Sequence, residues 1–151
     1  MWTASIGHGR KRWRRKMETR SQLPSQHHLI AVIDDNTAVR DSLKFALAVE
    51  GFAVRVYANA EQFLAETQFP DFDCVIVDQN MPGMNGLELI TALRERRITA
   101  PAILITSHPN ASLRQRAGAA GVPIVEKPFL SSALLDGVRR SVANAAKPLS
   151  R

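Results

Sequence analysis

The chain has 151 residues, which suits one domain with its own buried core and is too short for two comfortable ones. Hydrophobic residues make up 45% and charged residues 23%, which are ordinary values for a globular domain, and the single cysteine, Cys74, excludes a disulfide framework within the chain. No apolar stretch reaches the roughly 18 residues that a membrane-spanning helix needs, and the N-terminus lacks the apolar segment of a secretory signal. We therefore expect a soluble, cytoplasmic protein.

The net charge of +6 is unevenly distributed along the chain. Residues 1–28 contain seven Lys or Arg and one acid, Glu18, whereas the remainder contains thirteen basic and thirteen acidic residues. The domain itself is therefore electrically balanced, which argues against nucleic-acid binding by the fold. Six positive charges surround Trp13 in residues 10–16, a pattern that could bind nucleic acid or an anionic membrane surface. We favour a disordered extension without such a role. The predicted organisation is thus a basic arm (1–27), a folded domain (28–146) and a tail or linker stub (147–151).

Short apolar runs and amphipathic segments alternate from residue 29 onward. The run 29–33 is typical of a strand that is buried on both faces, and the apolar spacing over 37–50 predicts a helix that Gly51 ends. Residues 52–57 alternate like a strand nearer the edge of a sheet. Asn59 then caps a short helix.

The second half of the domain continues the same alternation. Residues 73–77 predict another buried strand, and a turn-forming stretch over 80–86 leads from it to a helix. The remaining predicted elements are the strand 102–105, the helix 110–120, the short strand 122–125 with Pro123 favouring an edge position, and a last helix capped by Ser131 or Ser132. Five strands alternating with five helices indicate a doubly wound α/β sheet, whose functional site lies outside the carboxyl ends of the strands.

Polar side chains stand at the carboxyl ends of four predicted strands. They are Asp34, Asp35, Asp78, Thr106, Ser107 and Lys127, and the lysine is followed by Pro128. Three clustered carboxylates repel one another without a cation, and their oxygens suit a hard ion such as Mg²⁺. Phosphoryl transfer needs charge neutralisation and positioning, so Lys127 and Thr106 could each hold a phosphoryl oxygen while Asp78 acts as the nucleophile. Each residue alone is more typical of a turn, a core hydroxyl or a surface charge, but the combination favours a phosphoryl-transfer site.

Residues 28–146 resemble the receiver domains of bacterial two-component response regulators. The similar motifs are Ile33-Asp34-Asp35, Val77-Asp78, Ile105-Thr106-Ser107 and Lys127-Pro128-Phe129, together with the loop from Asp78 to Gly86. Residues 52–64 look closest to the FixJ-like, LuxR-type subgroup. The resemblance implies a flavodoxin-like or CheY-like fold, in which a five-stranded parallel sheet of order 2-1-3-4-5 carries helices on both faces.

The resemblance also implies roles for individual residues. Asp34, Asp35 and Asp78, with the backbone carbonyl of Asn80, would hold Mg²⁺, and a cis peptide would join Lys127 to Pro128. A histidine kinase or phosphotransfer protein would donate the phosphoryl group to Asp78. The domain would act in signalling rather than as an enzyme, and the aspartyl phosphate would hydrolyse slowly.

Signalling in such domains depends on a switch. Thr106 would move toward the phosphoryl group, and the surface of the helix 110–120, the strand 122–125 and the last helix would change. A second copy of the chain, a downstream protein or an output domain that is missing from this sequence would then bind to this surface. The switch position three residues before the lysine is usually Phe or Tyr, but here it is Ile124, which can neither swing as a ring nor donate a hydrogen bond.

Two other functions remain open at this stage. A receiver-like scaffold could bind a protein partner without phosphorylation, and Ile124 argues mildly for it. A phosphohydrolase of the haloacid-dehalogenase type is disfavoured, because such enzymes place their nucleophile in an Asp-x-Asp after the first strand. Here Asp34 and Asp35 are adjacent, and the chain lacks the length for a cap domain. The sequence alone does not separate a stand-alone receiver from part of a longer regulator.

Overall fold

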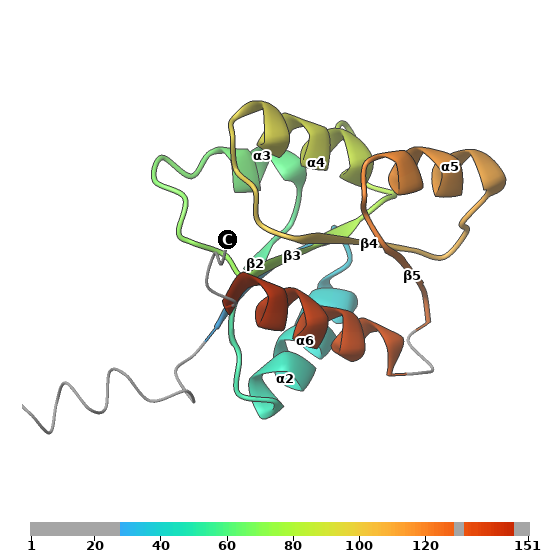
Figure 1. Cartoon of the computed structure of the whole chain (residues 1–151). Helices are drawn as coiled ribbons and strands as arrows, with labels where there is room; N and C mark the ends of the chain where they lie inside the picture. Colours follow the sequence, from blue (N-terminus) through green and yellow to red (C-terminus); the bar gives the residue numbers. More distant parts are fainter. Residues whose placement is uncertain (1–27, 129–131, 147–151) are drawn as a thin grey trace, which may run out of the picture.

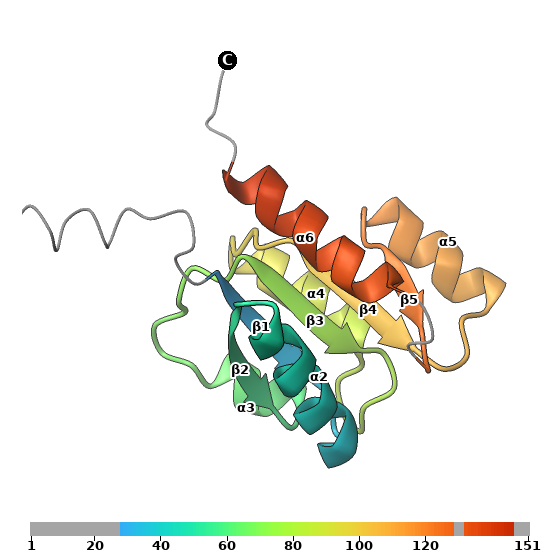
Figure 2. The ribbon, with the colours of Figure 1, turned by 90° about the horizontal axis from the view of Figure 1, so that it is seen from below.

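Five parallel strands form one sheet in the order β2-β1-β3-β4-β5 (Figures 1 and 2). The protein is seen in a computed structural model that describes residues 28–128 and 132–146. The strands are β1 (Leu29–Ile33), β2 (Ala53–Tyr57), β3 (Cys74–Asp78), β4 (Ala102–Thr106) and β5 (Ile124–Glu126). The strand order confirms the predicted doubly wound sheet, with β3 at its centre and β2 and β5 at its edges.

Helices cover both faces of this sheet. They are α2 (Thr37–Val49), α3 (Ala60–Leu64), α4 (Gly86–Glu95), α5 (Ala111–Ala119) and α6 (Ala133–Ala146). One face carries α2 and α6, and the other carries α3, α4 and α5 (Figures 1 and 2). Within the described parts of the chain, no helix combines the length and the apolar character that crossing a membrane requires.

The continuous apolar runs of the central strands serve two cores at once. Successive side chains of a strand point to opposite faces, so a strand covered on both sides is apolar throughout. In β1, Ile30 and Val32 pack with α2 and α6, whereas Ala31 and Ile33 pack with the helices of the other face. This division explains why 29–33 and 73–77 could be recognised as strands without alternation.

Asparagine caps begin four of the five helices. In each case the side-chain oxygen accepts a hydrogen bond from the backbone N–H three residues on, which satisfies a donor that the helix itself leaves unpaired. The capping residues are Asn36, Asn59, Asn85 and Asn110. The cap at Asn59 and the end of α2 at Gly51, whose φ is 93°, confirm the predicted positions.

Element bounds differ from the predicted ones by one or two residues, and β5 differs most. The predicted strand 122–125 includes Pro123, but β5 begins only at Ile124. Because proline has no N–H, Pro123 contributes only its carbonyl, which accepts a hydrogen bond from Leu104 N at 2.9 Å. The predicted edge position of this strand is confirmed.

Some predictions fall outside the described residues. These are the basic arm over 1–27, the tail over 147–151 and the possible cap at Ser131. Ser132 directly precedes α6, and its carbonyl accepts a hydrogen bond from Asp136 N at 2.8 Å. Its hydroxyl donates to the Asp136 carboxylate at 2.9 Å, which links the residue before α6 to the first turn of the helix.

Candidate functional site

The carboxyl ends of β1, β3, β4 and β5 meet at one edge of the sheet because all four strands run parallel. Asp34 follows β1, Asp78 ends β3, Thr106 ends β4 and Lys127 follows β5. The register brings Asp78 beside Ile105 and Thr106 beside Glu126. The predicted residues therefore converge as the topology requires.

The centre of the site is a half-buried ammonium group between two buried carboxylates. Lys127 Nζ lies 2.9 Å from Asp34 Oδ2 and 3.2 Å from Asp78 Oδ1. The side chains of Asp34 and Asp78 are only 0% and 4% exposed, and that of Lys127 is 16% exposed. Two buried acids thus share one half-buried cation, and their negative charge is not fully neutralised.

Backbone groups hold both carboxylates in place. Asn36 N donates to Asp34 Oδ1 at 2.9 Å, and Asn80 N donates to Asp78 Oδ1 at 3.3 Å. Asp35 adds a third carboxylate from the exposed side, with one oxygen of each acid within 4.8 Å of the others. An all-oxygen set of this kind, buried on one side and open on the other, fits a hard divalent cation that keeps several of its waters.

The pKa values of Asp78 and Lys127 reflect burial and the charges of their neighbours. Burial, reinforced by the nearby charge of Asp34, raises the pKa of Asp78 to about 6, although Lys127 acts in the opposite direction. Burial by itself lowers the pKa of Lys127, but its hydrogen bond to Asp34 and the charges of both acids outweigh that effect and raise it overall. An additional positive charge at this site would therefore stabilise the ionised form of Asp78.

The hydroxyl of Thr106 is buried on the other side of Asp78. Its Oγ1 accepts hydrogen bonds from Asn80 Nδ2 and His108 N, each at 3.2 Å. Its carbonyl accepts a hydrogen bond from Lys127 N at 2.8 Å, which joins the end of β4 to the lysine. Lys127 and Pro128 are connected by a cis peptide bond, as predicted.

Two predicted residues lie at the margin of this cluster. Ser107 is exposed, and among the described residues its side chain contributes no hydrogen bond to the site. Ile124 lies at the start of β5 opposite Leu104 and is half-buried against the core under α3, α4 and α5. This is the residue that the resemblance predicts as the switch, and it packs against the core rather than among the carboxylates.

The sequence reading missed three residues that shape the site. Gln79 is buried and its Oε1 accepts a hydrogen bond from Leu87 N at 2.9 Å, which ties α4 to the residue after Asp78. A Cβ on Gly86 would lie 2.6 Å from the Asp78 carbonyl oxygen, so only glycine fits this close approach. Arg40 donates to the carbonyl oxygen of Asp34 at 2.7 Å. Gly86 was visible as a turn residue, but no local pattern marked Gln79 or Arg40.

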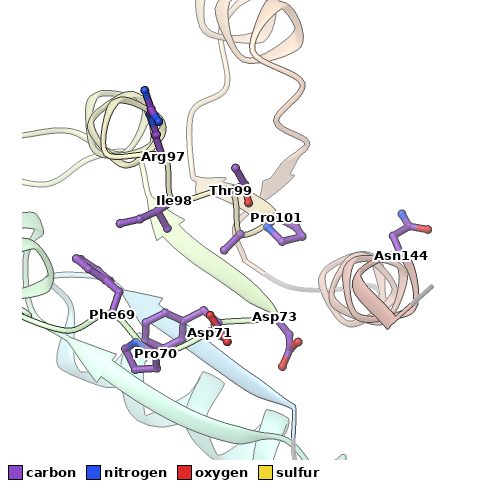
Figure 3. Close-up of a pocket in the computed structure, with 11 residues that line it drawn as sticks. Phe69, Pro70, Asp71, Asp73, Arg97, Ile98, Thr99, Pro101 and Asn144 are labelled. Carbon is purple, nitrogen blue, oxygen red and sulfur yellow. The ribbon is translucent and has the colours of Figure 1, made fainter. Parts of the chain in front are cut away.

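A cleft of about 580 Å³ lies away from these carboxylates (Figure 3). Its walls come from the segment before β3, the loop before β4 and the end of α6. Figure 3 shows the Asp71 and Asp73 carboxylates on one wall and the charged end of Arg97 pointing away from them. The cleft contains none of the predicted site residues.

The doubly wound sheet and its buried Asp–Lys–Asp cluster together define a CheY-like domain. The sequence matches the response regulator receiver domain family over residues 30–139. The chain therefore belongs to the response regulator receiver domain family, as the motifs predicted. Such domains are signalling modules of two-component systems rather than enzymes.

The similar proteins include members of the predicted FixJ-like subgroup. The chain is 35% identical over 115 residues to the transcriptional regulatory protein FixJ of Rhizobium meliloti, covering 76% of this chain and 56% of that protein. It thus spans little more than half the length of this relative. The crystal structure of FixJ-N has 33% identity and a TM-score of 0.70, covering 82% of this chain and 99% of that one. The chemotaxis protein CheY4 of Vibrio cholerae has 28% identity and the same TM-score, covering 76% and 98%.

Proposed function

We propose that Asp78 accepts a phosphoryl group from a histidine kinase or phosphotransfer protein, with Mg²⁺ held by Asp34, Asp35, Asp78 and the Asn80 carbonyl. The observation that carries this proposal is the half-buried Lys127 ammonium within hydrogen-bonding distance of the buried Asp34 and Asp78 carboxylates. Two buried carboxylates and a positively charged group lie together here, which supports the assignment of one carboxylate as acceptor and the other as a ligand of the cation. Membership of the receiver family supports the same assignment.

The residues of the site divide the work of the transfer. An Asp78 carboxylate oxygen forms a bond to phosphorus as the bond from phosphorus to the donor's histidine nitrogen breaks, and that nitrogen leaves with the electron pair. Lys127 binds one phosphoryl oxygen, and the Thr106 hydroxyl binds another. Bound Mg²⁺ would neutralise part of the phosphoryl charge. Slow hydrolysis of the aspartyl phosphate then resets the domain.

Thr106 connects the chemistry to the rest of the molecule. Its hydroxyl oxygen accepts hydrogen bonds from Asn80 Nδ2 and His108 N, so its O–H is left to donate to a phosphoryl oxygen when Thr106 moves toward that group. Because Lys127 N is bonded to the Thr106 carbonyl, a shift of Thr106 is transmitted to the end of β5. The surface of α5, β5 and α6 changes as a result, and this surface would bind a second copy, a downstream protein or an output domain.

Labelling by a small phosphodonor tests the acceptor directly. Acetyl phosphate with Mg²⁺ is expected to label the wild-type protein, and Asp78→Asn is expected to abolish the label because an amide cannot act as the nucleophile. Asp71→Asn is the matched control, since Asp71 is an exposed aspartate on the wall of the separate cleft. Unchanged labelling of Asp78→Asn would exclude Asp78 as the acceptor, and labelling in excess EDTA would exclude the metal requirement.

A receiver-like scaffold that works without phosphorylation is the second candidate, and Ile124 is the observation that favours it. This side chain is already half-buried against the core, with no ring to exchange between positions. Beryllofluoride with Mg²⁺, which mimics the phosphoryl group, distinguishes the two. Amide NMR shifts near Ile124 and along α5 move if phosphorylation is transmitted to this surface, and they stay in place if the domain is a scaffold.

A further inference from the structure

Arg40 lies in the first turn of α2, next to the acids that follow β1, and has no part in the transfer described above. Its Nη1 donates to the Asp34 carbonyl oxygen at 2.7 Å, and its Nη2 donates to Thr37 Oγ1 at 3.1 Å. The side chain is half-buried. Hydrogen bonds at both Nη1 and Nη2 leave the planar guanidinium little freedom, so it holds the Asp34 carbonyl in one direction.

This carbonyl is the last group of Asp34 that needs a partner. The Asp34 N–H donates to the Tyr57 carbonyl at 3.1 Å, and the carboxylate binds Lys127 and Asn36 N. With Arg40 on its carbonyl, every polar group of this fully buried residue is paired. Because the peptide bond is planar, fixing the Asp34 carbonyl also fixes the direction in which the chain enters Asp35.

Asp35 is the exposed member of the three acids, and burial does not hold its side chain in place. We propose that Arg40 is a positioning residue that preorganises Asp35 for the divalent cation by clamping the Asp34 carbonyl. This inference rests on the metal site of the proposed function. Groups that orient metal ligands from behind commonly change metal affinity by roughly tenfold or more.

The positive charge of Arg40 has an electrostatic effect on Mg²⁺ binding that is opposite in sign to the effect of the clamp. A positive charge beside a cation site repels the cation, so removing it for electrostatic reasons alone should strengthen Mg²⁺ binding. Removing a clamp should weaken binding instead. The two explanations therefore predict opposite signs for the same variant.

The experiment measures Mg²⁺ affinity by NMR titration for the wild type, Arg40→Gln, Arg40→Lys and Lys44→Gln. We expect Arg40→Gln to bind Mg²⁺ roughly tenfold more weakly, and Arg40→Lys to recover only part of that loss because an ammonium group lacks the two-nitrogen fork. Lys44→Gln removes an exposed charge from the same helix and should bind Mg²⁺ as tightly as wild type, or slightly more tightly. Binding by Arg40→Gln that equals or exceeds wild type overturns the proposal, as does full recovery in Arg40→Lys.

Amide exchange without metal separates this inference from the proposed function. If Arg40 holds the turn, Arg40→Gln should speed exchange at Asn36 N, which donates to Asp34 Oδ1, by several-fold while leaving the β3 and β4 amides unchanged. Unchanged exchange at Asn36 overturns the clamp even if Mg²⁺ binding falls. Wild-type protein that fails to bind Mg²⁺ would contradict the proposed metal site, whereas faster exchange in the variant would still show that Arg40 fixes the turn.

Discussion

The proposed acceptor side of the site (Asp34, Asp78 and Lys127) and its proposed switch side (Thr106 and Ile124) are built differently. On the acceptor side, Asp34 and Asp78 are buried and accept hydrogen bonds from backbone N–H groups, and the half-buried Lys127 is held between them. Thr106 is buried too, but its hydroxyl is held by neutral hydrogen bonds of 3.2 Å, and Ile124 lies half-buried on a strand of three residues. The acceptor side is strongly constrained by charge, whereas the switch side is constrained by weaker contacts that can be exchanged.

This difference suits the two tasks. Phosphoryl transfer requires groups that are already in position, because reorganising charges during the reaction is costly. Transmission of the signal requires a region with two arrangements of similar energy. Substitutions on the acceptor side should therefore change stability strongly, and substitutions on the switch side should change it little.

Lys127→Met should have the largest effect. Removing the ammonium leaves Asp34 and Asp78 buried without their shared partner, which should lower the free energy of unfolding at neutral pH by roughly 3 kcal/mol. Urea denaturation in EDTA measures the change. The exposed Lys44→Met is the matched control and should stay near wild type. A loss as small as that of the control would show that the half-buried lysine does not balance the two acids.

Asp78→Asn should stabilise the metal-free protein. The pKa of Asp78 is raised from 3.8 to about 6 in the folded state, so its protonated form is favoured there. The stability that this group contributes is present below about pH 4 and is lost as the pH rises through about 6. Near pH 7 the variant should therefore be more stable by on the order of 2–3 kcal/mol, and the difference should become small near pH 4. Thermal melts in EDTA from pH 4 to 8 measure it, and a difference independent of pH would contradict the assignment.

Thr106→Val should have the smallest of these effects. The substitution keeps the shape of the side chain but leaves Asn80 Nδ2 and His108 N without their acceptor, at a cost of about 1 kcal/mol. Labelling of Asp78 should persist, while the beryllofluoride-induced NMR shifts along α5 should shrink. Shifts as large as in wild type would remove Thr106 from the signal path and make the two sides of the site alike.

Much of the fold could be predicted because its signals are local. The apolar runs, the cap at Asn59 and the stop at Gly51 each depend on neighbouring residues, and all appear in the structure. The start of β5 was misplaced because hydrophobicity does not report hydrogen bonding: Pro123 is apolar in sequence but lacks the N–H that a strand needs.

The identities of the acids, Thr106 and Lys127 could be predicted from the sequence alone, because parallel topology requires the carboxyl ends of the strands to meet. Only the tertiary structure decided how these groups interact. One lysine partly neutralises two buried acids, Gly86 leaves space beside the Asp78 carbonyl, and Arg40 binds the Asp34 carbonyl. All three features depend on distances of about 3 Å between groups in different turns, strands and helices. Sequence spacing specifies which residues can meet, but packing sets these distances and, with them, the charges and constraints of the site.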